Sequence, residues 1–152
     1  MTAEELVAYL ARSIPEYAAE HVRTGEWTEA EALERSRADH AALLPEGVAS
    51  PGHFLRTVHD AGTGRRVGEV WYGLRSVGER PELWVYWIGI DPAFRRRGYA
   101  AATFRAVEDE ARRLGADRLA LHVFGANTGA RALYETLGFV PVDLVLAKPV
   151  RP

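Results

Sequence analysis

Three arginines and a glycine, Arg95, Arg96, Arg97 and Gly98, stand together in the stretch DPAFRRRGYAAATF. Arginine suits phosphate well, because its guanidinium group donates several charge-assisted hydrogen bonds at once. Glycine lacks the Cβ that would hold an anion away from the backbone amides. A helix that begins directly after Gly98 would add its unpaired first amides and the positive end of its dipole. The stretch is therefore built like a binding site for a diphosphate.

The arginine cluster alone does not distinguish a diphosphate site from two alternatives. A solvated basic loop in front of a helix would contain the same residues. A nucleic-acid surface fits less well, because the net charge is −2 and no aromatic residues interleave with basic ones. The chain contains neither GxxxxGK[ST] nor GxGxxG, so the turn is neither a Walker loop nor a dinucleotide-binding loop.

The first part of the chain is expected to form two helices in front of this turn. Proline at position 15 should kink or split the first of them. The second, in WTEAEALERSRADHAALLP, begins with the capping-box pair Thr28 and Glu31 and ends before Pro45. The first helix is indicated by apolar and aromatic residues at helical spacing, namely Leu6, Leu10, Ile14, Tyr17 and His21.

The rest of the chain alternates between strands and helices. HFLRTVHD and RVGEVWYGL flank the turn-rich AGTGR and predict a hairpin. ELWVYWIGI is apolar on both faces, which is typical of a central strand, and Asp91 and Pro92 end it. A helix from about Tyr99 to Leu114 should end at Gly115. It is followed by a strand in DRLALHVF, a helix in TGARALYETLG that ends at Gly138, and a last strand in FVPVDLVLAK.

This order of elements predicts one mixed α/β domain over residues 1–152. The sheet is mostly antiparallel, with N-terminal helices and one strand–helix–strand unit. The two strands of that unit should be parallel, with a ligand crevice at their C-terminal ends. The arginine–glycine turn lies at that crevice.

Composition and charge narrow the function classes. The chain has no cysteine, which excludes disulfides, a thiolate nucleophile and a thiolate metal site. It lacks a signal-peptide pattern and an apolar run near the ~18 residues of a membrane span, so we expect a cytoplasmic protein without a membrane or metal partner. Residues 1–50 hold ten acidic and four basic residues, and residues 51–152 hold eleven and fifteen. The second part therefore suits an anionic ligand.

Two motifs together resemble the GNAT superfamily of N-acetyltransferases over about residues 53–147. The acyl-CoA motif [Q/R]-x-x-G-x-[G/A] of that family is matched by Arg95, Gly98 and Ala100. The motif N-x-x-A-x-x-x-Y-x-x-x-G-F follows in the expected order. It is matched by Asn127, Ala130, Tyr134, Gly138 and Phe139.

The resemblance implies acetyl-CoA as co-substrate and a set of residues that hold it. The pantetheine arm would bind the backbone of Ile88, Gly89 and Ile90. Asn127 would contact the cofactor from the start of its helix, or serve as a plain N-cap. The diphosphate would lie on the backbone of Arg95, Arg96, Arg97, Gly98, Tyr99, Ala100 and Ala101.

The resemblance also assigns the proton chemistry. Tyr134 matches the tyrosine that protonates the departing thiolate, unless its ring only packs on the core. Family members often carry a glutamate as general base near the end of the central strand, where this chain has Gly89 or Asp91. In ribosomal-protein N-terminal acetyltransferases a glutamate stands five residues before the asparagine, where this chain has His122. We predict His122 as the base, with Glu69 or a water chain as alternatives.

The function expected from these residues is direct transfer of acetyl from acetyl-CoA to a primary amine of a small molecule or peptide. The alternative is an acyl-CoA-binding module without catalysis. Trp27, Trp71, Tyr72 and Trp84 weakly favour a cationic or aromatic amine. The oligomeric state stays open between a monomer and a homodimer. Family members usually open with a strand, whereas this chain begins with the helical MTAEELVAYL, which bears on the amine pocket.

Overall fold

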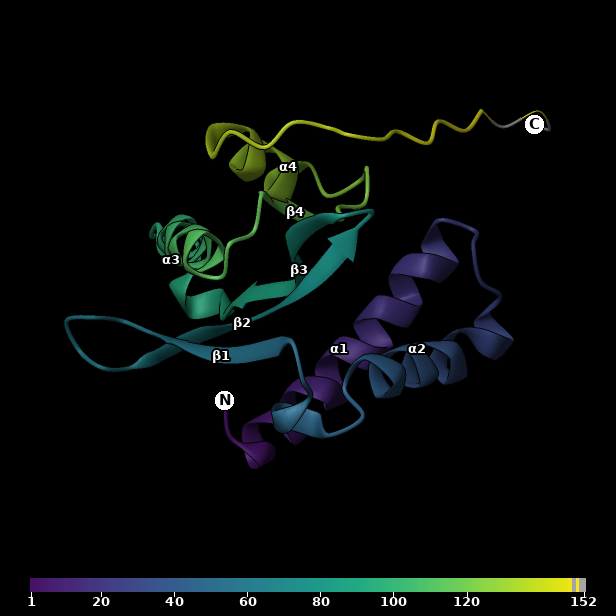
Figure 1. Ribbon diagram of the computed structural model, residues 1–152. Helices are drawn as coiled ribbons and strands as arrows, with labels where there is room; N and C mark the ends of the chain where they lie inside the picture. Colours follow the sequence, from purple (N-terminus) through teal and green to yellow (C-terminus); the bar gives the residue numbers. More distant parts are fainter. Residues whose placement is uncertain (149, 151–152) are drawn as a thin grey trace. The chain divides into compact units, whose positions relative to one another are not determined.

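The computed structural model of the chain describes residues 1–148 and 150. These residues form two compact units, Met1–His122 and the segment from Val123 onward, which are described separately. The first unit contains a four-stranded sheet and three α-helices (Figure 1). In chain order the elements are α1 (Ala3–Arg23), α2 (Glu29–Leu43), η1 (Gly47–Ala49), β1 (His53–His59), β2 (Arg66–Val77), β3 (Arg80–Ile90), η2 (Pro92–Phe94), α3 (Tyr99–Arg113), β4 (Arg118–Leu121) and, in the second unit, α4 (Thr128–Thr136).

The sheet has the predicted mixed topology. Its strand order is β1-β2-β3-β4, with antiparallel pairing across the first three strands. β3 and β4 are parallel and are joined through α3, as the strand–helix–strand pattern predicts. The last strand expected in FVPVDLVLAK is wrong, because residues 139–148 form no strand. An apolar alternation favours a strand, but a strand forms only where a neighbouring strand accepts its ladder of hydrogen bonds.

α1 is one continuous helix, so Pro15 does not split it. Proline removes one helical hydrogen bond, but the surrounding turns are fixed by packing. Ser13 and Ala18 are buried on either side of it, and the Ser36 hydroxyl of α2 donates to the Ile14 carbonyl at 2.8 Å. The start of α2 is as predicted, since the Thr28 amide donates to Glu31 Oε1 at 3.1 Å.

Helices cover both faces of the sheet in the first unit (Figure 1). α1 and α2 lie on one face, where Leu6 and Tyr9 form a core with Leu55 and Trp71. α3 lies on the other face and buries Phe104, Val107 and Ala111. Leu114, at its end, is half-buried. This packing fixes the position of α3, and with it the turn at its start, against the strands.

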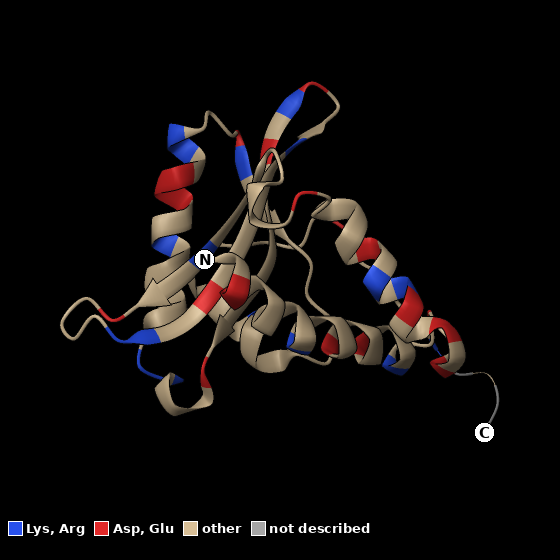
Figure 2. Cartoon of the chain, turned by 90° about the horizontal axis from the view of Figure 1, so that it is seen from below, with Lys and Arg blue, Asp and Glu red and all other residues tan. Residues whose placement is uncertain are grey.

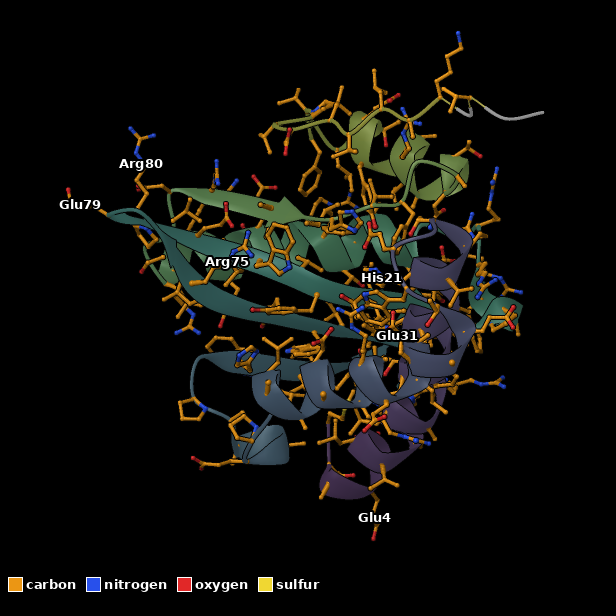
Figure 3. The ribbon with its side chains drawn as sticks, turned by 90° about the vertical axis from the view of Figure 1, so that its right-hand side faces the viewer. Glu4, His21, Glu31, Arg75, Glu79 and Arg80 are labelled. Carbon is orange, nitrogen blue, oxygen red and sulfur yellow. The ribbon has the colours of Figure 1, made fainter. Side chains whose placement is uncertain are left out.

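Charged residues are interspersed along the helices (Figure 2). In α3, Arg113 pairs with Glu110 at 2.5 Å, and Arg112 pairs with Asp109 at 2.6 Å. At the exposed tip of the β2–β3 hairpin, Glu79 and Arg80 point outward (Figure 3). No helix in the described part of the chain is long and apolar enough to cross a membrane.

Candidate functional site

β3 has an open edge at the point where the sheet divides. β4 pairs with β3 only over residues 82–85, although β3 continues to Ile90. A β-bulge lies at the same place, because the register between β2 and β3 shifts at Trp71 and Tyr72 and leaves Tyr86 as an extra residue. Beyond the bulge, no strand of the described chain lies beside this edge. Such an edge presents unpaired N–H and C=O groups.

Two of the three predicted strand residues present their peptide groups to this open edge. The Asp91 amide donates to a carbonyl of β2 at 2.9 Å, so the peptide groups of Asp91 and Gly89 face β2. Because successive peptide groups alternate between the two sides of a strand, those of Ile88 and Ile90 face the open edge. The Ile90 carbonyl accepts a hydrogen bond there from Arg95 Nε at 3.0 Å.

The backbone between η2 and α3 is left-handed at two positions. Arg96 has a φ of 63°, which is uncommon for a residue with a side chain, and Gly98, the N-cap of α3, has a φ of 82°. A Cβ at Gly98 would meet no atom within 4 Å. Gly98 has no side chain to accept from the first amides of α3, whereas Thr2 caps α1 and Asn127 caps α4. These amides therefore remain open to an anion.

The arginines of the turn add positive charge that no acid neutralises. The side chains of Arg95, Arg96 and Arg97 are exposed, and none forms an ion pair with a carboxylate among residues 1–148 and 150. Arg97 lies over the ring of Phe94 at 5.7 Å, which steadies the side chain without reducing its charge. The turn thus combines open amides with unpaired guanidinium groups.

Tyr99 joins the turn to the β1–β2 hairpin. Its hydroxyl donates to Asp60 Oδ2 at 2.7 Å, and Asp60 Oδ1 accepts from the Thr63 hydroxyl at 2.7 Å. The hydrogen bond to Asp60 raises the pKa of the Tyr99 phenol, and the bonds from Thr63 and Tyr99 lower the pKa of Asp60. The Tyr99 side chain therefore supports the turn, and only the Tyr99 backbone is left to bind a ligand.

Glu69 fills the space above Gly89, where related enzymes carry an acid. The two residues are cross-strand partners in β2 and β3, so both face the α1 side of the sheet. A Cβ at Gly89 would lie 3.1 Å from Glu69 Oε1 and 2.9 Å from Trp87 Nε1. The Glu69 side chain is buried. A carboxylate is therefore present beside Gly89, but it comes from the neighbouring strand.

Both oxygens of Glu69 are held by guanidinium groups. Arg12 of α1 donates to Oε1 at 2.8 Å, and Arg66 donates to Oε2. Arg66 also donates to Asp91 Oδ2 at 2.9 Å, so the other acid considered for the base is paired as well. Proton uptake by Glu69 or Asp91 would have to compete with these ion pairs.

His122 stands where β3 and β4 separate. The last parallel pair joins Val85 to Leu121, where β4 ends, and His122 is the next residue along the chain. The bulge residue Tyr86 occupies the corresponding place on β3. The His122 side chain is exposed. The predicted base therefore follows directly on the strand that borders the open edge.

In the second unit, Asn127 and Tyr134 belong to α4 and its N-cap. Asn127 Oδ1 accepts from the Ala130 amide at 3.1 Å, which confirms the N-cap role. Tyr134 is half-buried and its ring lies 5.7 Å from that of Phe139. Burial raises the pKa of the Tyr134 phenol above its ordinary value. The phenol therefore keeps its proton throughout the neutral range.

The aromatic residues expected to favour an amine have structural contacts instead. Trp71 and Tyr72 are buried in the sheet. Trp84 is covered by the guanidinium of Arg75, 3.5 Å from the ring centroid. Trp27 stacks on His21 with centroids 4.1 Å apart. Each of these rings is therefore already engaged in contacts within the protein.

Sequence analysis did not predict two residues that lie near Gly89. Arg12 follows the buried Tyr9 by three positions on α1, so its charge lies on the apolar side of that helix. A charged residue at such a position is a signal that the sequence contained. Trp87 buries its indole Nε1 without a hydrogen-bond partner in the described chain. Buried donors are normally paired, so this one is a candidate to meet a bound ligand.

Comparisons with known proteins agree on one family. A profile described as the Acetyltransferase (GNAT) family matches residues 14–139. YdgE, an uncharacterised N-acetyltransferase of Bacillus subtilis, is 33% identical over 97% of this chain and 94% of its own length. A mycothiol acetyltransferase of Beutenbergia cavernae is 39% identical over 59% of this chain and 29% of its own length. The crystal structure of YycN from Bacillus subtilis superposes with a TM-score of 0.89 at 33% identity, covering 100% of this chain and 96% of that chain.

Proposed function

Since this chain belongs to the Acetyltransferase (GNAT) family, we propose that it transfers an acetyl group from acetyl-CoA to a primary amine of a small molecule or peptide. The reaction is a direct attack of the amine in a ternary complex. An acetylated enzyme intermediate on sulfur is excluded, because the chain contains no cysteine.

The observation that supports this proposal best is the pairing of an open strand edge with an uncapped helix start. The peptide groups of Ile88 and Ile90 face the open edge, and the chain then runs directly into the turn at Gly98. The peptide groups of Ile88 and Ile90 can bind the amide groups of a pantetheine arm, and the turn at Gly98 can bind a diphosphate. The residues present thus fit the two polar parts of acetyl-CoA.

In the proposed mechanism the chain's own residues bind, orient and move protons. Acetyl-CoA supplies the acetyl group as a thioester. The strand amide near Ile90 donates to the developing oxyanion, and such donors commonly contribute a large part of the rate. His122 takes the proton of the attacking amine, and Tyr134 gives a proton to the departing thiolate. The raised pKa keeps the phenol protonated at neutral pH, the form in which it can donate.

His122 is preferred to Glu69 because its side chain is exposed, whereas the Glu69 carboxylate is buried and paired. Both Glu69 oxygens already accept hydrogen bonds from Arg12 and Arg66. His122 is exposed at the point where the strands separate. Glu69 instead fixes Arg12 of α1 to the sheet beside Gly89.

The proposed function is tested by incubating the protein with acetyl-CoA and a panel of amines, and measuring free thiol. The protein has no thiol of its own, so all thiol that appears comes from CoA. Amine-dependent release supports acetyl transfer. Binding of CoA without release by any amine would leave only the acyl-CoA-binding module.

We expect CoA affinity to fall with rising salt concentration. The proposed diphosphate contacts are charge-based and exposed, and such contacts are screened within about 10 Å at 0.1 M salt. Replacing Arg95, Arg96 and Arg97 together by glutamine should weaken binding and flatten the salt dependence. Isothermal titration at several salt concentrations measures both. An affinity that salt leaves unchanged would mean that the arginines are only a solvated run.

A second expectation concerns the base. If His122 accepts the proton, His122→Ala should lower kcat/KM by roughly 10²–10⁴-fold and alter its dependence on pH. Glu69→Gln is the comparison, because it leaves the imidazole in place. A pH profile that His122→Ala does not alter would refute the assignment of His122 without refuting acetyl transfer.

A further inference from the structure

A hollow with a volume of about 460 Å³ lies between α3 and the strands β1 and β2. Its lining residues come from these three elements and from the turn that joins β1 to β2, so the hollow belongs to the first unit alone. Two alanines of α3, Ala102 and Ala106, lie one turn apart on the side that borders it, and their short side chains leave the space open. Its apolar lining includes Val58, Val70 and Val107. A hollow of this size, apolar and with a few polar groups around it, is typical of a site for a small organic molecule.

The charged side chains around this hollow favour an anionic ligand. The acids are already bound, because Asp60 accepts from two hydroxyl groups and Glu110 Oε2 accepts from Arg113 Nε at 2.9 Å. Arg56 forms no ion pair with a carboxylate among the residues that the structure describes, and its guanidinium lies over the ring of Phe54, 5.6 Å from the centroid. The hollow therefore combines an apolar lining with a guanidinium group that can accept a carboxylate partner.

We propose that this hollow binds a small molecule with an apolar body and one carboxylate, and that Arg56 binds the carboxylate. The planar guanidinium donates two parallel hydrogen bonds to such a group. The apolar body covers the valines of the lining and removes them from water, which is favourable. His59, another basic residue at the hollow, places no negative charge near the carboxylate. The site goes beyond acetyl transfer and does not depend on it, since the hollow is lined from β1, β2 and α3 and the open edge belongs to β3.

The test uses octanoate as the anionic probe and octanamide, which has the same chain without the charge, as its neutral counterpart. Isothermal titration of the full chain, with neither acetyl-CoA nor an amine present, measures both affinities. We expect octanoate to bind about tenfold more tightly than octanamide, the effect of a hydrogen-bonded charge pair. Arg56→Gln should abolish this preference, whereas Arg56→Lys, which keeps the positive charge, should retain most of it.

Filling the hollow should prevent binding of both probes. Ala106→Phe and, one turn earlier, Ala102→Phe place a ring there, and both alanines are exposed, so the helix can carry the larger side chain. Ala8→Phe is the matched control, because Ala8 is an exposed alanine of α1, on the other face of the sheet. It should bind octanoate like the wild type. Thermal melting of each variant without a probe shows that the fold is kept.

Several results would overturn the proposal. They are a wild-type chain that does not bind octanoate at millimolar concentration, equal affinities for octanoate and octanamide, and binding that survives both Ala106→Phe and Ala102→Phe. Saturating CoA should leave octanoate bound, since displacement would place the probe in the cofactor site instead of the hollow. A chain that transfers no acetyl group would leave these measurements unchanged, so the two proposals can fail separately.

Discussion

Tyr134→Phe is expected to lower kcat by about 10²–10⁴-fold, the usual contribution of a general acid. The change removes only the hydroxyl group. The Tyr134 ring lies with its centroid 5.7 Å from that of Phe139, and a phenylalanine ring would keep this packing. The affinity for CoA should therefore stay nearly constant. Single-turnover kinetics with acetyl-CoA and a confirmed amine measure the loss of rate, and titration with CoA measures the affinity for CoA.

The pH dependence of the wild-type enzyme provides the control for Tyr134. Burial raises the pKa of this phenol above its ordinary value, so the acid form persists throughout the neutral range. Ionisation of Tyr134 should therefore cause no loss of kcat in that range. A Tyr134→Phe variant with full activity would contradict the proton transfer and, with it, the proposed transfer mechanism.

Gly98→Glu is expected to abolish CoA binding. A side chain at Gly98 would occupy the open space beside the first amides of α3, and a carboxylate there would repel a diphosphate. For the wild type, CoA at 100 times its dissociation constant should stabilise the fold by about 2.7 kcal/mol. For a chain of this length this corresponds to a rise in Tm of about 5–10 °C. The variant should show no rise.

Gly78→Glu is the matched control for this experiment. Gly78 also has a positive φ, 63°, and a Cβ there would also meet no atom within 4 Å. Backbone strain and added charge are therefore similar, but Gly78 lies in the β2–β3 turn, at the opposite end of β3 from the turn that leads into α3. The Gly78→Glu variant should lose some stability and keep the CoA-induced rise in Tm. Unchanged CoA affinity in Gly98→Glu would show that the diphosphate site has been placed wrongly.

Local signals were sufficient to predict most of the elements. Gly115 and Gly138 end their helices with positive φ values, and the apolar run of β3 marks a strand inside the sheet. These features depend on a few neighbouring residues, so the sequence contains them directly. The mixed topology followed because a helix between two strands requires a parallel crossover.

Features that depend on partners distant in sequence were not predicted. Pro15 does not end α1, because contacts from α2 hold the adjoining turns. Residues 139–148 have strand pattern, but a pattern cannot supply the neighbouring strand. The placement of Glu69 above Gly89 depends on the register between β2 and β3. A one-residue shift of that register would turn the Glu69 side chain to the other face of the sheet.

The packing over Gly89 limits how this site can change by mutation. An acid at position 89 would collide with the indole of Trp87 and the carboxylate of Glu69. Removing Glu69 first would leave Arg12 without its carboxylate partner at the edge of the core. Positions 69, 87 and 89 are therefore coupled: an acid at position 89 requires the side chains of Glu69 and Trp87 to move, so the effect of a substitution at any one of the three depends on the other two.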